Sequence, residues 1–205
     1  VISYFTDSKH DPVEVLERAS ELKGVEPSVV PIEPVFNGLV VEDKHFPLFM
    51  GPERVLILDE TLLKGVIQGI RKRFGSAGEA ILFYQGKESG RYYAELIPRL
   101  FGSALTADHP SLARMVEAFL RTMGMGLVVI EKLDPVRGYA RITVGDSLEC
   151  CVGKGSDEPY SHFLRGIFAG IFERVFGSEV EVRETMCIAK GDEVCEFQVI
   201  KRQSL

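Results

Sequence analysis

The stretch ETMCIAKGDEVCEFQV, residues 184–199, begins with a glutamate whose position raises the first question about the fold. Immediately before it, Val180 and Val182 alternate with polar residues, which is typical of a half-buried strand. Glu184 follows on the same apolar side as these valines. Because an unpaired buried charge is costly, this carboxylate needs a partner. The two cysteines of the stretch suggest that the partner is a metal ion.

The same stretch ends in a second strand, VCEFQV, in which alternation turns Cys195 and Phe197 inward. Cys187 lies three residues after Glu184, so in an unbroken strand these two side chains would point to opposite faces. They can meet one ion only if the strand bulges or turns near Met186. The turn AKGD that follows favours such a change of direction, and we expect one there.

Glu184, Cys187 and Cys195 together offer one carboxylate and two thiolates, an acceptable set for zinc, which prefers four ligands in a tetrahedron. Three residues could supply the fourth ligand: His162, Cys150 and Cys151. A competing interpretation is that all four cysteines of the chain are buried core thiols, because free cysteine is among the most buried residue types. Without a metal, Arg165 or Arg174 could pair with the carboxylate instead.

The composition describes a chain that can bury its own core, with 205 residues of which 45% are hydrophobic. A net charge of -6 argues against a nucleic-acid partner. The longest apolar runs are far shorter than the roughly 20 residues of a membrane span. Four cysteines without a visible secretory signal indicate a reducing compartment, so we expect a cytoplasmic protein. A single Asn and four Gln are compatible with a thermophile.

The chain is expected to divide into an N-terminal appendage, residues 1–36, and a main domain, residues 37–205. The appendage begins with a strand and a helix, and the prolines of VEPSVVPIEPV then exclude a helix and disfavour a central strand. GLVVED and VLILD follow as short predicted strands at residues 38–43 and 55–59.

Three amphipathic helices are predicted next, over residues 60–74, 79–97 and 111–124. Asp59 or Thr61 is the candidate N-cap of the first. Gly86 and Gly90 lie inside the second, where each costs about 1 kcal/mol, so we expect them to permit close packing. Two strands joined as a hairpin are predicted at residues 126–134 and 138–146, and SLECCVG, residues 147–153, is expected to continue or add a strand.

The last predicted helix lies in SDEPYSHFLRGIFAGIFERVFG, residues 156–177, between the start signal Pro159 and the stop signal Gly177. Its apolar stripe is wide enough to be buried on two sides. Gly166 and Gly170 leave a groove of small residues on it, where a backbone, a partner subunit or a ligand could approach closely.

Residues 159–199 resemble the C-terminal half of the 4-vinyl reductase domain family, whose pattern is G-x-x-A-G followed by E-x-x-C-x-x-x-G-x-x-x-C-x-F. The matching residues are Gly166, Ala169, Gly170, Glu184, Cys187, Gly191, Cys195 and Phe197. The family includes archaeal hydrocarbon-binding proteins and sensor domains of phenol- and toluene-responsive activators, and its fold is similar to TRAPP subunits. The resemblance implies an α/β (α+β) fold, with an antiparallel sheet of about four strands packed against several helices. It also implies a homodimer and a buried apolar ligand pocket.

In the aromatic sensors of this family, the resemblance implies a zinc ion held by Cys, Glu, Cys and Cys. Glu184, Cys187 and Cys195 match three of these positions, while Ser161 stands at the place of the first cysteine. We therefore predict a metal set of these three residues with His162, which follows the serine, and keep Cys150 and Cys151 as alternatives to the histidine.

These features favour a non-catalytic domain that senses or binds a small hydrophobic molecule. The predicted pocket walls are Phe83, Tyr84, Tyr92, Tyr93, Phe163 and Phe168, which could equally be core residues. One alternative is an enzyme of the 4-vinyl reductase type acting on a tetrapyrrole, although MGMG at 123–126 leads from helix to strand, the reverse of a dinucleotide-binding turn. Another is a TRAPP-like scaffold protein that holds an acyl chain.

Overall fold

The computed structural model describes residues 11–23, 34–36, 39–40, 46–50, 52–101 and 109–202. Two compact units divide between Leu56 and Ile57, which is later in the chain than the boundary expected after residue 36. The predicted strand at the start of the chain lies outside the described residues. Among the helices that are described, none is both long and apolar enough to cross a bilayer.

The described part of the first unit contains a short helix and two small hairpins. Helix α1 spans Pro12–Ser20, and the Asp11 side chain caps it by accepting a hydrogen bond from the Val13 amide. The strands are β1 (Pro34–Phe36) paired with β2 (Leu39–Val40), and β3 (Phe49–Met50) paired with β4 (Glu53–Arg54).

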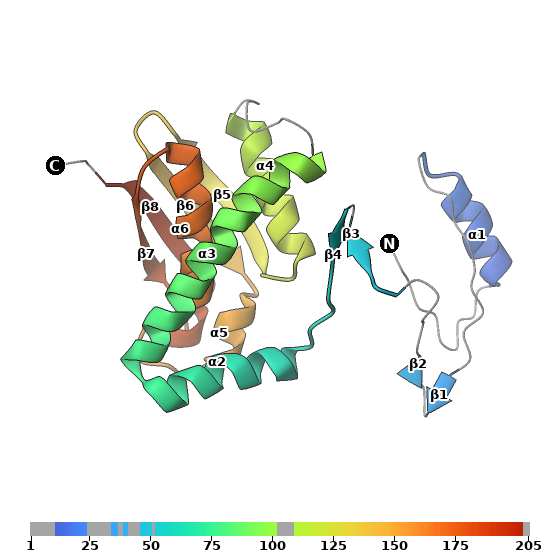
Figure 1. The fold of residues 1–205 in the computed structure, drawn as a ribbon, viewed down its shortest axis with the longest axis horizontal. Helices are drawn as coiled ribbons and strands as arrows, with labels where there is room; N and C mark the ends of the chain where they lie inside the picture. Colours follow the sequence, from blue (N-terminus) through green and yellow to red (C-terminus); the bar gives the residue numbers. More distant parts are fainter. Residues whose placement is uncertain are drawn as a thin grey trace. The chain divides into compact units, whose positions relative to one another are not determined.

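The second unit combines helices with one antiparallel sheet (Figure 1). Its elements are α2 (Glu60–Phe74), α3 (Ser76–Phe101), α4 (His109–Thr122), β5 (Leu127–Asp134), β6 (Tyr139–Gly145), α5 (Leu148–Val152), α6 (His162–Phe176), β7 (Val180–Met186), η2 (Ile188–Lys190) and β8 (Cys195–Lys201). The four strands pair in the order β5-β6-β8-β7. The predicted α+β fold with a four-stranded antiparallel sheet is therefore confirmed.

Helix α6 packs on β7 and β8, and α3 packs on α6, so that α6 is buried between the sheet and another helix. The ring of Phe168 on α6 meets the ring of Phe197 on β8 edge to face, with 5.0 Å between centroids. The inward alternation predicted for β8 is confirmed, because Cys195, Phe197 and Val199 are all fully buried. The wide apolar stripe of α6 is explained by this burial on two sides.

Helices α3 and α6 approach so closely that their backbones touch at glycines. A Cβ atom added to Gly86 would lie 2.0 Å from the Phe163 carbonyl oxygen, and one added to Gly166 would lie 2.1 Å from the Phe83 carbonyl oxygen. Gly90 and Gly170 make equally close approaches one turn further on. The close packing predicted for the α3 glycines is confirmed, and the small-residue groove predicted on α6 is filled by α3.

Two of the predicted strands are wrong. Residues 55–59 form no strand, and Leu56, Ile57 and Leu58 are exposed. Residues 148–152 form the five-residue helix α5 instead of extending β6. The backbone leaves the strand at Asp146, which has a φ of 48°, and Ser147 then stands at the N-cap of α5. This turn directs the α5 side chains toward the end of the sheet where β7 and β8 meet.

Candidate metal centre

Four potential ligands from separate elements come together in the second unit. Cys150 comes from α5, Glu184 from β7, Cys187 from the position before η2, and Cys195 from the start of β8. Their ligand atoms all lie within 4.8 Å of one another. The three cysteines are buried and the glutamate is partly buried. A group of this kind can hold a metal ion.

An irregularity in β7 brings Cys187 to the same place as Glu184. The register between β7 and β8 shifts between Glu184 and Met186, so the alternation is interrupted where the sequence predicted it would be. Met186, which unbroken alternation would turn inward, is exposed as a result. The predicted change of direction near this residue is confirmed.

The distances between the sulfur atoms are those of a compact ligand group. The Sγ atom of Cys150 lies 3.3 Å from that of Cys195 and 3.5 Å from that of Cys187. Zinc–sulfur bonds of about 2.3 Å in a tetrahedron place the sulfurs about 3.8 Å apart, so a small expansion would admit the ion. The Glu184 carboxylate lies 3.9 Å from the Cys150 sulfur. Three sulfurs and one oxygen suit zinc.

Backbone amides support two of these sulfurs from outside the group. The Tyr160 amide donates to Cys187 Sγ at 3.4 Å, and the Ile188 amide donates to Cys195 Sγ at 3.4 Å. The Cys187 amide itself donates to the Asp192 carboxylate at 2.7 Å, which holds the turn before β8. Donors aimed at sulfur favour the thiolate form that binds a metal.

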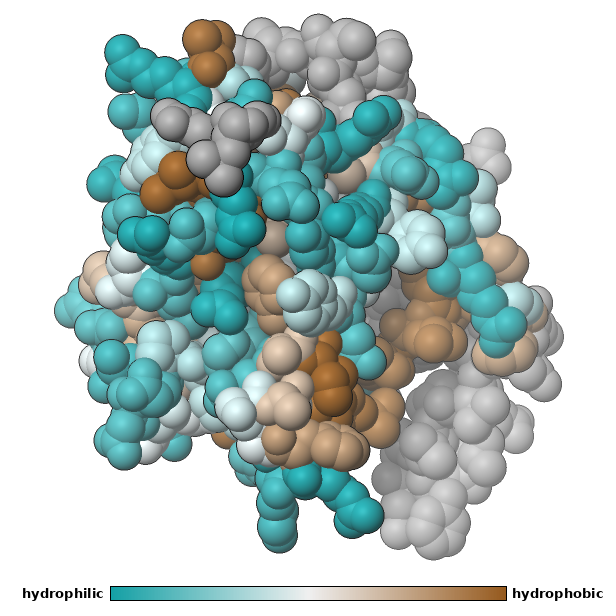
Figure 2. Space-filling view, turned by 60° about the vertical axis from the view of Figure 1, so that its left-hand side comes forward, coloured by the Kyte–Doolittle hydropathy of each residue, from teal (hydrophilic) through white to brown (hydrophobic). Residues whose placement is uncertain are grey.

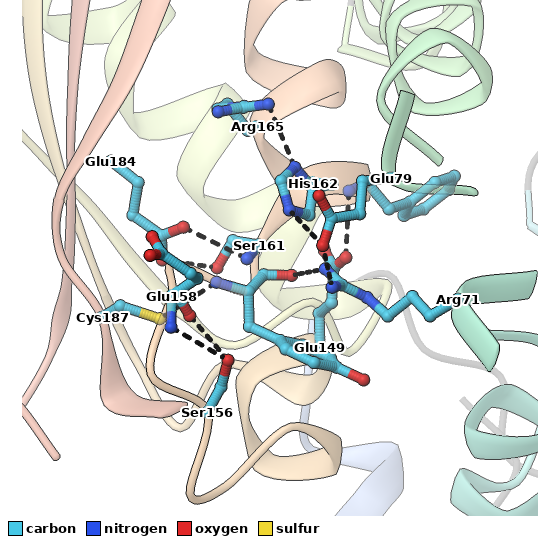
Figure 3. Close-up of polar contacts among 12 residues, drawn as sticks. Arg71, Glu79, Glu149, Ser156, Glu158, Ser161, His162, Arg165, Glu184 and Cys187 are labelled. Atoms are coloured by element: carbon cyan, nitrogen blue, oxygen red, sulfur yellow. Dashed lines mark hydrogen bonds and ion pairs between the residues drawn. The ribbon is translucent and has the colours of Figure 1, made fainter. Parts of the chain in front are cut away.

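Ser161, at the N-cap of α6, answers the question of what Glu184 faces (Figure 3). Its hydroxyl donates to Glu184 Oε1 at 2.8 Å, and its amide donates to Oε2 at 3.1 Å. The hydroxyl oxygen also lies 2.9 Å from the Cys150 sulfur. Among the described residues, Glu184 forms no ion pair with an arginine, so its partners are the serine and the sulfur group.

The four groups have strongly shifted pKa values. Burial raises the pKa of Glu184 to about 8, against the opposing effect of the Ser161 hydrogen bond. Hydrogen bonds from Cys150 and then Cys195 lower the pKa of Cys187, while the bond to Cys187 raises that of Cys150. The pKa of Cys195 is lowered by its bond to Cys150 but raised more by Cys187 and burial, to about 12. One thiolate shared by two thiols results, and a bound cation would displace the remaining protons.

His162 points away from this group, so the structure brings Cys150 to the cluster in its place. The histidine Nδ1 accepts a hydrogen bond from Arg165 at 3.0 Å, and Nε2 lies 3.6 Å from Glu79 Oε1 (Figure 3). Burial, followed by the charges of Arg165 and Arg71, lowers the pKa of His162 to about 4, and the ring is neutral at pH 7. Cys151, the other alternative, is partly exposed and lies 3.5 Å from an Asp146 carboxylate oxygen.

Glu149, the neighbour of Cys150, was missed by the sequence reasoning. Its carboxylate is buried and accepts hydrogen bonds from the Phe163 amide at 3.0 Å and the Leu164 amide at 2.9 Å, in the first turn of α6. Burial raises its pKa to about 7. Five residues are too few to show helical periodicity, so no pattern in the sequence indicated that α5 carries two inward-facing polar side chains.

The six aromatic residues predicted as pocket walls lie in different environments. Phe168 is buried against Phe197, and Tyr93 meets Phe119 edge to face at 4.9 Å. Phe83, which lies 5.1 Å below the Arg165 guanidinium, and Phe163 are partly buried. Two of the six are largely exposed: Tyr84 at 63% and Tyr92 at 70%.

The family model of the vinyl-4-reductase domain matches residues 140–201, the segment from β6 to β8 that contains all four potential ligands. This chain therefore contains a vinyl-4-reductase domain, and the predicted resemblance to the 4-vinyl reductase domain family is confirmed. The uncharacterized protein MJ0150 of Methanocaldococcus jannaschii is 28% identical over 151 residues, which cover 72% of this chain and 80% of that protein.

Two solved structures show the same fold. The phenol-responsive sensory domain of the transcription activator PoxR, solved with phenol, aligns with a TM-score of 0.66 at 16% identity, over 96% of this chain and 92% of that chain. Subunit 3 of the trafficking protein particle complex from Naegleria fowleri, covalently bound to palmitic acid, aligns with a TM-score of 0.52 at 17% identity, over 71% and 96%. At these identities the likeness concerns the fold.

Proposed function

We propose that this protein is a non-catalytic, sensor-type domain that binds a small hydrophobic molecule and is stabilised by a zinc ion. The observation that carries the proposal is the buried group of Cys150, Glu184, Cys187 and Cys195 inside the vinyl-4-reductase domain. All four tetrahedral positions would be filled by protein side chains. Such closed sites are structural, whereas catalytic zinc sites keep one position open for water or substrate.

The hydrophobic ligand is supported by the fold shared with the PoxR domain, whose structure contains phenol, and with a TRAPP subunit that carries palmitic acid. The pocket we propose lies between α3, α6 and the sheet, with Phe83, Phe163 and Phe168 among its walls. Reduced thiols in all four cysteines fit a cytoplasmic protein. A homodimer is the assembly we expect.

The test is native mass spectrometry with elemental analysis, on protein purified without added ligand. We expect one zinc ion per chain and a small apolar molecule that exchanges for phenol or another aromatic probe, which would raise the melting temperature by binding only the folded state. Zinc far below one equivalent, with Cys187 and Cys195 freely modified by a thiol reagent, would refute the metal centre. A covalently retained acyl chain would favour a scaffold, and turnover of a vinyl tetrapyrrole would favour an enzyme.

A further inference from the structure

We propose that the metal centre acts, through Cys150, as a latch that holds α5 against the N-terminus of α6. This inference rests on the proposed zinc site and concerns what its occupancy controls. Two consecutive residues of α5 reach in two directions. Cys150 enters the sulfur group, and Glu149 accepts the amides of Phe163 and Leu164.

Helix α6 depends on α5 for its cap. Its own N-cap residue, Ser161, makes no side-chain capping bond, because the serine hydroxyl is used by Glu184. The first turn of a helix has amide groups without partners inside the helix, and a carboxylate is the favoured acceptor for them. Glu149 supplies both of its carboxylate oxygens to this turn. The start of α6 is therefore satisfied only while α5 stays in place.

Helix α5 has little stability of its own. It is five residues long, well below the length at which an isolated helix is stable. Apart from Glu149 and Cys150, it is held by a hydrogen bond from the Gln68 side chain to the Val152 carbonyl at 3.1 Å, and by packing of Val152 with Ile67. Thiol hydrogen bonds are weak, whereas a zinc–thiolate bond ties its ligand firmly. Metal occupancy thus decides how tightly this end of α5 is anchored.

The chain also contains the position from which the same centre could be built without α5. Ser161 Oγ lies 2.8 Å from Glu184 Oε1, 2.9 Å from Cys150 Sγ and 3.9 Å from Cys195 Sγ, so a sulfur at 161 would face the same group. The exchange Cys150→Ala with Ser161→Cys keeps three thiolates and one carboxylate. It moves one ligand from α5 to α6 and cuts the link between the metal and α5.

The experiment compares hydrogen exchange in the zinc-loaded and chelated states of the wild type and of this double variant. In the wild type, we expect chelation to speed exchange of the Phe163 and Leu164 amides and of α5 by about tenfold or more. In the double variant, thiolate-to-cobalt absorption after cobalt substitution should report a full set of ligands, while exchange in α5 is fast with or without metal. Cys151→Ser, on α5 but outside the group, is the matched control and should behave as the wild type.

A second variant separates the cap from the metal. Glu149→Gln should retain stoichiometric cobalt binding but lose the protection of the Phe163 and Leu164 amides, since an amide offers one acceptor oxygen instead of two. A wild-type protein that binds no metal would overturn the zinc site and the latch together. Metal binding with equal exchange of α5 in both wild-type states, or unchanged metal affinity in Cys150→Ala, would overturn the latch alone and leave the zinc site standing.

Discussion

Glu184 is a partly buried carboxylate that receives two hydrogen bonds from one serine and borders three sulfurs. With its pKa raised to about 8, it is mostly protonated at pH 7 in the metal-free chain. Its negative charge is therefore of use chiefly when a cation is bound. The roles of single residues in this protein can be separated by whether they matter with the metal, without it, or in both states.

Glu184→Gln should weaken zinc binding while leaving the metal-free protein almost unchanged. A glutamine is similar in shape to the protonated glutamate and can still accept from Ser161, but a neutral amide is a poor zinc ligand. We expect a loss of zinc affinity beyond the roughly 10- to 100-fold typical of changes outside the ligand set. Competition with a chelator gives the affinity, and melting with and without chelator gives the stability. Glu196→Gln, on β8, is the control, and equal effects of the two substitutions would contradict the prediction.

His162 should make the protein less stable as the pH falls from about 6.5 to about 4. The unfolded chain takes up a proton near the ordinary pKa of 6.5, whereas the folded histidine does so only near a pKa of about 4. Stability is complete above pH 6.5 and is lost on the way down. Its side chain is 13% exposed, so after solvent screening we expect about 1 to 2 kcal/mol. Urea unfolding at pH 7 and pH 5 should show a smaller difference for His162→Gln than for the wild type; an identical difference would rule this out.

At the scale of elements, the contact of α3 with α6 organises the second unit. Glycines on both helices let the backbones touch, and paired charges follow the same seam. Lys87 lies 2.7 Å from Glu173, and Arg91 lies 3.0 Å from the same carboxylate. Because these two pairs are at the surface or close to it, the close backbone packing contributes more to the specificity of the interface than the charges do.

Gly86→Ala should destabilise the protein by at least about 2 kcal/mol, because the added methyl group meets the Phe163 carbonyl and the helices must separate. Gly69→Ala on α2 is a matched control, since nothing lies within 4 Å of a Cβ atom there. Alanine favours the helix, so this control should gain up to about 1 kcal/mol. Both values come from chemical denaturation monitored by circular dichroism. Equal effects would mean that the close contact is not a constraint.

Removal of the metal should loosen the hairpin of β7 and β8 before the rest of the second unit unfolds. Glu184 and Cys187 lie on one side of its turn and Cys195 on the other, so the ion would tie the two arms together. We expect the amides of residues 184–195 to gain exchange on chelation, while the amides of α3 keep their protection. Simultaneous loss of protection in both regions would show instead that the metal stabilises the unit as a whole.

At the scale of the whole molecule, apolar side chains remain exposed on the helices that were expected to form a dimer. Ile81, Tyr84 and Tyr92 recur on one stripe of α3, and Leu62 and Val66 are about half exposed on α2. Figure 2 shows a face on which hydrophilic residues predominate and hydrophobic ones gather in patches. Exposed apolar groups clustered on one helix face are typical of an interaction surface.

We expect the chain to be a homodimer that uses this stripe of α3. Tyr92→Glu would place a charge in the interface and should shift the protein toward monomer in sedimentation or light scattering at micromolar concentration. Val136→Glu is the control, because Val136 is 90% exposed in the turn between β5 and β6. A wild type that is already monomeric at these concentrations would count decisively against the dimer.

Much of this molecule could be predicted from local patterns. The alternation around Val182 and Phe197 determined two strands, the wide stripe between Pro159 and Gly177 determined a helix buried on two sides, and the displaced Glu184 indicated a bulge and a metal. Each of these patterns depends on neighbours along the chain, whose geometry follows from the period of a strand or a helix.

The remaining features were decided by tertiary structure. Whether SLECCVG continued a strand or formed a helix depended on the backbone at Asp146, and five residues carry no readable period. The presence of Cys150 in the metal group instead of His162 depended on where that short helix docks against β7 and β8. Contacts between segments far apart in the sequence leave no spacing rule in it, because the packing of whole elements, and not the local chain, brings those side chains together.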